Sequence, residues 1–222
     1  IERIGPVFGQ LYGQTEGYPI SVLSKADHDT SQPELFGCCG HANASVQVRL
    51  LDDDLNEVPE GEPGEICVRS RQIMDGYWKR PEQTEETLRG GWLHTGDVAR
   101  LDDRGFLYIV DRKKDMIVSG GENIYPAEIE NVLFSHPGIQ DVAVIAVPDE
   151  KFGEAALAVC VLKPDATATS AELIAFCQER LASYKTPRRY DLVQEIPRNP
   201  SGKILKRVMR EPYWQNTERR VG

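Results

Sequence analysis

The sequence lacks any long hydrophobic run. Every apolar stretch is much shorter than the ~20 consecutive residues that a helix needs to cross a bilayer. Residues 1–4 have neither the basic start nor the apolar core of a signal peptide. We therefore expect no membrane span and a cytoplasmic protein.

Positive charge is also scarce. The chain has 26 lysine and arginine residues against 35 aspartate and glutamate residues, and its formal net charge is -9. Nucleic acid is not expected as the main partner, because binding it relies on a broad basic surface that neutralises phosphates. Ten of these basic residues lie in three short clusters at residues 112–114, 185–189 and 203–210. Each cluster is either a local anion-binding site or an ordinary solvated surface.

Cysteine is present in an odd number, five, and the spacing of these residues matches neither a zinc site nor a paired disulfide framework. Cys67, Cys160 and Cys177 lie within apolar patterns. The sequence therefore predicts buried, unpaired thiols at these three positions.

The first half of the chain has the patterns of a mainly β region. Val46, Val48 and Leu50 alternate with polar residues, which is the period of a half-buried strand. Turns rich in Gly, Pro and Asp separate this segment from the next apolar runs. The predicted elements are strands at residues 46–50, 65–69, 98–101 and 106–110, and a short helix at residues 81–88.

From residue 112 onward the pattern changes to α+β. After Pro126, the residues Ile129, Val132 and Leu133 fall on one face, which is typical of an amphipathic helix. Buried strands are predicted at residues 142–147 and 155–162. Pro148-Asp149 is expected to end the first strand, and Gly153 lies before the second. A further helix is predicted to begin near Ser170. We expect two domains, residues 1–111 and 112–222.

Four short polar motifs that contain glycine follow one another in a fixed order. They are Tyr12-Gly13-Gln14-Thr15-Glu16, Thr95-Gly96-Asp97, the run from Asp111 to Glu130, and residues 197–203 (PRNPSGK). Together they resemble the later motifs of the adenylate-forming superfamily, whose acyl-CoA synthetases join a carboxylic acid to AMP and then to a thiol. The resemblance runs from about Phe8 to Val208.

The resemblance implies an α+β fold. A β-rich subdomain of the distorted-barrel type, the C-terminal part of a large adenylate-binding domain, would span residues 1–111. A small mobile α+β lid, the C-terminal domain of AMP-binding enzymes, would span residues 112–222. The family's phosphate-binding loop, rich in Ser, Thr, Gly and Lys, would lie well before residue 12. We therefore expect this chain to be the C-terminal portion of an enzyme, with a missing N-terminal segment as its partner.

The first motif is expected to contact ATP and its metal. By resemblance the ring of Tyr12 covers adenine, and Gly13 and Gln14 lie against the nucleotide, where glycine permits a close approach of backbone. The hydroxyl of Thr15 can donate to the α-phosphate. Glu16 offers the hard oxygen ligand that Mg²⁺ prefers. Without the other motifs, a plain glycine turn with an exposed acid would explain the same residues.

In the second motif, Asp97 is the expected ribose anchor, because a carboxylate can accept hydrogen bonds from both ribose hydroxyls. Taken alone, Thr95-Gly96-Asp97 is a common turn sequence. His94, just before it, is expected to be structural, since no nucleophile lies nearby in the sequence.

The third motif would join the two domains. The resemblance implies that Arg112 contacts ribose and that Lys114 is the pivot about which the small domain rotates. A charged, exposed linker is compatible with a hinge, since hinges are often a few residues that absorb a large backbone change. Gly120 and Gly121 would then swing over the active site and help to form a channel for the pantetheine of CoA.

The last motif contains the expected catalytic residue. By resemblance the ammonium of Lys203 bridges the substrate carboxylate and the phosphate oxygens during adenylation. The motif is not a nucleotide-binding P-loop, because Pro197 replaces the first glycine and Ile204 follows the lysine. A surface lysine on a basic terminal helix is the simpler alternative.

These residues favour an ATP-dependent acid–thiol ligase that activates a fatty or aromatic acid and transfers it to CoA. The substrates and cofactors would be the carboxylic acid, ATP, with AMP as its product, Mg²⁺ and CoA. Three alternatives stay open. The acceptor could be the arm of a carrier protein, or adenylation could occur with no thioester step. The chain could also be a fragment that folds and binds but does not turn over.

Overall fold

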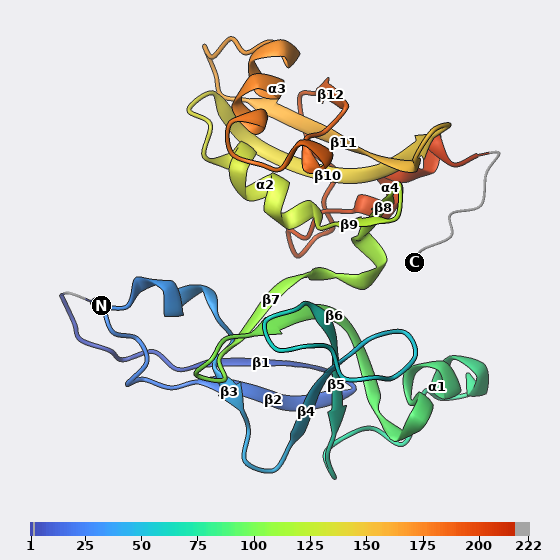
Figure 1. Cartoon of the computed structure of the whole chain (residues 1–222). Coiled ribbons are helices and arrows are strands. Elements are labelled where there is room, and N and C mark those ends of the chain that lie inside the picture. The colour runs from blue at the N-terminus through green and yellow to red at the C-terminus, as the bar shows by residue number, and fades with distance from the viewer. Residues whose placement is uncertain (2, 216–222) are drawn as a thin grey trace. The chain divides into compact units, whose positions relative to one another are not determined.

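The computed structural model describes residue 1 and residues 3–215, and the chain divides into two compact units, Ile1–Val110 and Asp111–Gly222 (Figure 1). Each unit has its own sheets and its own hydrophobic core. The predicted α+β class is confirmed. Most strand pairs are antiparallel, and the parallel pair β11–β12, connected through α3, is an exception in unit 2.

Unit 1 contains two sheets. The elements of the first are β1 (Gln10–Gln14), β2 (Gly17–Leu23) and β3 (His41–Ala42), and those of the second are β4 (Gln47–Leu51), β5 (Gly64–Arg69), β6 (Leu93–Leu101) and β7 (Leu107–Arg112). The strands are hydrogen-bonded in the orders β1-β2-β3 and β4-β5-β6-β7. Short helices connect them: η1 (Pro33–Gly37), α1 (Pro81–Thr87) and η2 (Arg89–Gly91). Among the described residues both sheets are open, and neither closes into a barrel.

The core of unit 1 lies between its two sheets. Ile20 of β2 packs with Leu50, Ile66 and Leu107 from the second sheet, and all four side chains are buried. The sheets are also joined by backbone bonds, from Cys39 N–H to the carbonyl of Leu107 at 2.7 Å among others. The strand that ends at Gln14 is thereby brought to β6, about 80 residues further along the chain in sequence.

Strand β6 is longer than predicted. The sequence predicts a strand only at residues 98–101, because Thr95-Gly96-Asp97 has the composition of a turn. In the structure the strand begins at Leu93 and passes through this motif. The pairing register with β5 shifts between Glu65 and Cys67, and Gly96 has a φ of 72°. A glycine irregularity of this kind lets a strand bend without ending.

Unit 2 contains one sheet with strand order β10-β11-β8-β9, and β12 pairs with β11. The strands are β8 (Ile117–Ser119), β9 (Glu122–Ile124), β10 (Ile139–Asp149), β11 (Gly153–Leu162) and β12 (Arg189–Leu192). The helices are η3 (Lys113–Asp115), α2 (Pro126–Phe134), α3 (Ser170–Gln178), η4 (Ser183–Lys185), α4 (Lys206–Arg210) and η5 (Glu211–Tyr213). The predicted helices at residues 126–133 and near Ser170 are confirmed.

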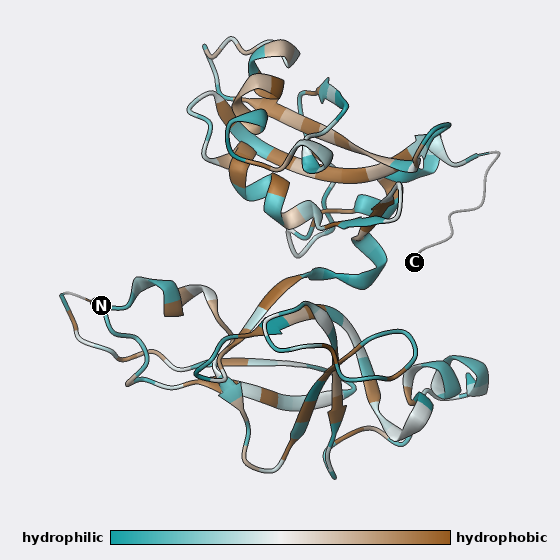
Figure 2. Ribbon diagram, viewed as in Figure 1, coloured by the Kyte–Doolittle hydropathy of each residue, from teal (hydrophilic) through white to brown (hydrophobic). Residues whose placement is uncertain are grey.

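Both faces of the long β10–β11 hairpin are covered, which explains why residues 142–147 and 155–162 are apolar without interruption (Figure 2). Val142 and Val144 lie on the face that packs with Ile129 and Leu173 from α2 and α3. The opposite face packs with the C-terminal segment. The strand residues on this face are Ala143, Ile145, Val147, Ala155, Leu157, Val159 and Val161. The residues of the C-terminal segment that pack against them include Ile196, Ile204 and Met209.

The prediction that Pro148-Asp149 ends the first of these strands is wrong, because β10 continues to Asp149, where it pairs with Gly153. Pro148 lies beside the hairpin tip, opposite Glu154, where the loss of one backbone donor is tolerated.

The prediction of buried thiols is confirmed for Cys67, Cys160 and Cys177, and the two other cysteines are buried and unpaired as well. In the part of the chain that the structure describes, no helix is long and apolar enough to cross a membrane.

Candidate functional site

The first motif forms the end of the β1–β2 hairpin. Gln14 pairs with Gly17, so Thr15 and Glu16 are the two turn residues between the strands. The register shifts beside Gly13, and a Cβ at Gly13 would lie 2.6 Å from the ring of Tyr18. The space beside Gly13 is therefore filled by a neighbouring ring, which is reason enough for glycine at this position.

Tyr12 and Asp97, the first and last residues of the first two motifs, are joined by a hydrogen bond. The Tyr12 hydroxyl donates to Oδ2 of Asp97 at 2.8 Å. Burial raises the pKa of Tyr12 well above its ordinary value of 10.0, and the adjacent Asp97 carboxylate raises it further. Tyr12 therefore remains a neutral donor at physiological pH. The ring that is expected to cover adenine and the carboxylate that is expected to bind ribose are one connected unit.

The bend at Thr95 and Gly96 is held by side chains and by β5. The Thr95 hydroxyl donates to the carbonyl of Ile66 at 2.8 Å, and the Gly96 N–H donates to Oε1 of Glu65 at 3.1 Å. The second oxygen of Glu65 lies 3.0 Å from Nδ1 of His94. The Glu65 and His94 side chains are only 6% and 7% exposed. The expected structural role of His94 is consistent with this contact.

A pocket of about 340 Å³ lies at the junction of the two motifs. Its lining residues are Gln14, Glu16, Glu65, Tyr77, Gln83, Glu86, Thr87, His94, Thr95 and Gly96. Residues from the first motif and from the second thus line one cavity, although about 80 positions separate them in the sequence.

The charge of this pocket is suited to a cation. Glu16, Glu65 and Glu86 contribute carboxylates, and the lining includes no lysine or arginine. A polyphosphate alone would be repelled by these acids. A divalent ion with hard oxygen ligands, such as Mg²⁺, fits the donors, and it would also neutralise phosphate charge. Glu16 is partly exposed and lies at the hairpin end, so its carboxylate can reach an ion in the pocket.

Sequence reasoning missed Glu65 and Tyr77, which also line this pocket. The Tyr77 hydroxyl donates to Oε1 of Glu16 at 2.6 Å. A signal for Glu65 was available, because it is an acid directly before the apolar residues Ile66, Cys67 and Val68 of β5. No comparable signal pointed to Tyr77, since it lies in an irregular segment before α1.

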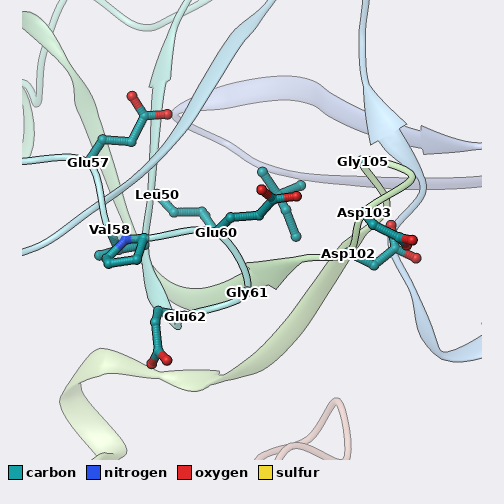
Figure 3. Close-up of a pocket in the computed structure, with 11 residues that line it drawn as sticks. Leu50, Glu57, Val58, Glu60, Gly61, Glu62, Asp102, Asp103 and Gly105 are labelled. Carbon is teal, nitrogen blue, oxygen red and sulfur yellow. The ribbon is translucent and has the colours of Figure 1, made fainter.

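A second pocket in unit 1, of about 360 Å³, is lined by acidic loops and contains none of the predicted residues. Figure 3 shows Glu57, Glu60 and Glu62 from the segment after β4 together with Asp102 and Asp103. No basic side chain lines it. It is therefore unsuited to an anionic ligand such as a nucleotide.

The remaining predicted residues, Arg112, Lys114, Gly120, Gly121 and Lys203, belong to unit 2. Arg112 ends β7, and Lys114 is an exposed residue in η3.

Asp111 anchors this segment. Its Oδ1 accepts the Arg112 N–H and its Oδ2 accepts the N–H of Ala127, each at 2.7 Å. Ala127 is in the first turn of α2, so Asp111 satisfies a helix N–H that would otherwise lack a partner. Burial raises the pKa of Asp111 above its ordinary value of 3.8.

Gly120 and Gly121 are the two turn residues of the β8–β9 hairpin. Their φ values are 62° and 92°, the left-handed conformations that a tight two-residue hairpin requires. The Gly120 N–H donates to the carbonyl of Phe152 at 2.9 Å. A Cβ at Gly120 would meet the Phe152 ring at 2.9 Å, whereas a Cβ at Gly121 would meet nothing within 4 Å.

Lys203 lies on a short, ordered loop before α4, and not in the helix itself. Oδ1 of Asn199 accepts the N–H of Ser201 at 3.1 Å and that of Lys203 at 2.8 Å. Arg198 donates to the carbonyl of Gly202 and to Oδ2 of Asp141, both at 2.7 Å. These bonds fix the backbone on both sides of Lys203.

The side chain of Lys203 is exposed, while its neighbour Ile204 packs against the apolar face of the β10–β11 hairpin. Within the described residues, the Lys203 ammonium makes no hydrogen bond and no ion pair. The other cations of this cluster are paired: Lys206 with Glu130 at 2.7 Å, Arg207 with Glu211 at 3.1 Å, and Arg210 with Asp115 at 3.0 Å. The basic cluster is therefore largely structural, and in the part of the chain that the structure describes Lys203 is its unpaired cation.

Comparisons with known proteins bear on both units. Residues 1–78 match the AMP-binding enzyme family, and residues 128–203 match the C-terminal domain of AMP-binding enzymes. The first match includes Tyr12 to Glu16, and the second ends at Lys203.

Relatives and solved structures cover nearly the whole chain. A long-chain-fatty-acid–CoA ligase of Escherichia coli O6:H1 is 46% identical over 95% of this chain and 37% of its own length. A fatty acid–[acyl-carrier-protein] ligase of Streptomyces coeruleorubidus is 42% identical over 96% of the chain and 41% of its own length. The structure of an amide bond synthetase from Marinactinospora thermotolerans aligns with a TM-score of 0.84 at 38% identity, over 96% of this chain and 42% of that one. The chain thus spans about two fifths of the length of these relatives.

Proposed function

Because the chain belongs to the adenylate-forming superfamily of AMP-binding enzymes, as its C-terminal portion, we propose that it serves in the ATP-dependent activation of a carboxylic acid. The acid is first joined to AMP, and the acyl group is then transferred to the thiol of CoA. A fatty acid is the favoured substrate class, since several relatives are named as fatty-acid ligases.

The observation that supports this proposal most strongly is the convergence of the two motifs in unit 1. Tyr12 donates to Asp97, and Glu16 and Thr95 line the same pocket. An adenosine monophosphate needs an aromatic surface, an anchor for its ribose hydroxyls, and a hydroxyl donor with a metal ligand beside its phosphate. The groups that would meet these needs are the ring of Tyr12, the carboxylate of Asp97, the hydroxyl of Thr15 and the carboxylate of Glu16, in that order.

In the adenylation step, an oxygen of the substrate carboxylate attacks the α-phosphorus of ATP. A new bond from carboxylate oxygen to phosphorus forms, the bond to the bridging oxygen breaks, and pyrophosphate leaves with that oxygen. Lys203 would stabilise the negative charge that carboxylate and phosphate bring together, since its ammonium is not engaged elsewhere among the described residues. Gly13 and Gln14 would lie along the nucleotide.

Mg²⁺ fits this site, and Glu16 would hold it. When bound, the ion supplies charge neutralisation to the phosphates. The roles of this chain's residues are to bind the nucleotide through Tyr12 and Asp97 and to keep the Glu16 carboxylate in the pocket.

In the second step, the thiol sulfur attacks the acyl carbon, a proton leaves the thiol, and AMP departs with the mixed-anhydride oxygen. We propose that unit 2 rotates about Lys114 between the two steps, withdraws Lys203, and presents Gly120 and Gly121 to the pantetheine arm. Arg112 would contact ribose. The exposure of Lys114 and of both glycines supports these roles.

Assays of the full-length enzyme test the proposal. Acid-dependent exchange of pyrophosphate into ATP reports adenylation, and release of AMP with and without CoA reports transfer. An absence of acid-dependent exchange would contradict the activation of a carboxylate.

A carrier-protein arm is the alternative acceptor, and one relative that is 42% identical is named as an acyl-carrier-protein ligase. Comparison of AMP release with CoA and with a carrier protein separates the two acceptors. AMP release that does not depend on CoA would favour the alternative. A cytoplasmic location remains part of the proposal.

A further inference from the structure

The carboxylate of Glu16 has a close neighbour, Tyr77, that lies outside the four sequence motifs. The Tyr77 hydroxyl donates to its Oε1 at 2.6 Å, a short distance that is typical of a charge-assisted O–H···O⁻ bond. The phenol is the donor in this bond and the carboxylate oxygen is the acceptor.

The segment that contains Tyr77 is fastened to the hairpin turn by its backbone too. The Met74 N–H donates to the carbonyl of Glu16 at 2.9 Å, and Ile73 forms a β-bridge with Gly17. Glu16 is thus held by this segment both at its main chain and at its side chain.

Tyr77 itself is fixed from the opposite side. Its N–H donates to Oγ1 of Thr84 at 2.9 Å, and the Thr84 hydroxyl donates to the carbonyl of Arg80 at 2.8 Å. Thr84 is in α1, so the first turns of this helix set the position of the Tyr77 backbone. The backbone from which the Tyr77 side chain extends toward Glu16 is therefore fixed by hydrogen bonds.

We propose that Tyr77 is a positioning residue for the metal-binding carboxylate of Glu16. It occupies Oε1, and within the described residues Oε2 makes no hydrogen bond or ion pair, so this oxygen is available to a divalent cation. A carboxylate that is held at one oxygen presents the other in a single direction. This lowers the conformational entropy that is lost when the ion binds. The inference rests on the proposed function, because that function assigns the metal to Glu16.

The alternative is that Tyr77 only fastens the segment before α1 to the hairpin. Direct measurement of metal binding separates the two roles. Full-length enzyme is titrated with Mn²⁺ in the presence of α,β-methylene-ATP, which is not cleaved at the α-phosphorus, and free Mn²⁺ is followed by electron paramagnetic resonance. Tyr77→Phe removes one hydroxyl and keeps the ring, so the packing of the segment is retained.

We expect Tyr77→Phe to weaken Mn²⁺ binding about tenfold, because the variant must order the Glu16 carboxylate when the ion binds. Glu16→Gln should weaken it at least as much. Tyr108→Phe is the matched control, since Tyr108 lies on β7 against Arg100 and does not line the pocket. This control should leave the affinity unchanged. In exchange assays the half-saturating Mg²⁺ concentration of Tyr77→Phe should rise, with most of the maximal rate recovered at high Mg²⁺.

An Mn²⁺ affinity that is the same in Tyr77→Phe as in wild type would overturn the inference, even if the variant were less stable. An equal loss in Tyr108→Phe would overturn it too. Failure of the proposed function has a different signature: wild-type enzyme would show no acid-dependent exchange, whatever its affinity for Mn²⁺.

Discussion

At the scale of single residues, Lys203 differs from the cations around it because its ammonium has no protein partner among the described residues. We predict that Lys203→Ala in the full-length enzyme lowers acid-dependent pyrophosphate exchange by roughly 10²–10³-fold, the usual cost of removing one preorganised donor. Thioester formation from supplied acyl-adenylate should be largely spared. Both half-reactions can be followed separately, adenylation by exchange and thioester formation by the loss of free CoA thiol.

Lys163→Ala is a suitable control for this variant, because Lys163 is exposed and its ammonium donates to the carbonyl of Pro137. It should affect neither half-reaction. Equal damage to both half-reactions by Lys203→Ala would contradict the role in adenylation.

Asp111 allows a prediction about pH. Burial raises its pKa, so the ionised carboxylate at neutral pH opposes folding, and this penalty disappears as the pH falls through the raised pKa toward the ordinary value of 3.8. Wild type should therefore gain stability relative to Asp111→Asn as the pH is lowered from neutrality. Urea unfolding of both proteins at several pH values measures this difference. A difference that stays constant with pH would show that burial does not penalise the charge.

Candidate site residues could be predicted from the sequence only where the residue type itself indicates a role. Tyr12, Glu16, Thr95 and Asp97 belong to recognisable motifs, and the structure brings these motifs together. Tyr77 could not be predicted, because its importance depends on a tertiary contact with Glu16 across an irregular segment.

At the scale of elements, the hairpin β8–β9 offers a matched pair of glycines. Both turn residues have positive φ, so alanine at either position costs roughly 1–2 kcal/mol of backbone strain. Only at Gly120 would the added Cβ also meet the Phe152 ring, at 2.9 Å. We predict that Gly120→Ala lowers the free energy of unfolding of unit 2 more than Gly121→Ala does. Urea denaturation measures both, and an equal or reversed order would contradict the prediction.

Elements were predicted well where periodicity and helix-start signals agree, as for α2, which begins at Pro126 as expected. They were predicted less well where a local signal competes with tertiary pairing. The turn-like residues at Gly96 lie inside β6, because β5 supplies partners on one side and Glu65 accepts the Gly96 N–H. Propensity is a weak guide when a neighbouring strand satisfies the backbone in this way.

At the scale of the whole molecule, the main question is whether 222 residues suffice for the chemistry. The acidic pocket beside Glu16 offers a metal ligand but no basic side chain for the β- and γ-phosphates. The 222 residues contain no loop rich in Ser, Thr, Gly and Lys ahead of Tyr12. We predict that residues 1–222 alone show negligible ATP–pyrophosphate exchange, while the full-length enzyme is active under the same conditions. The 222-residue chain can still bind AMP without turning over, because both members of the Tyr12–Asp97 pair belong to it. Calorimetry with AMP measures this binding. Robust exchange by the 222-residue chain would show that its own residues replace that loop.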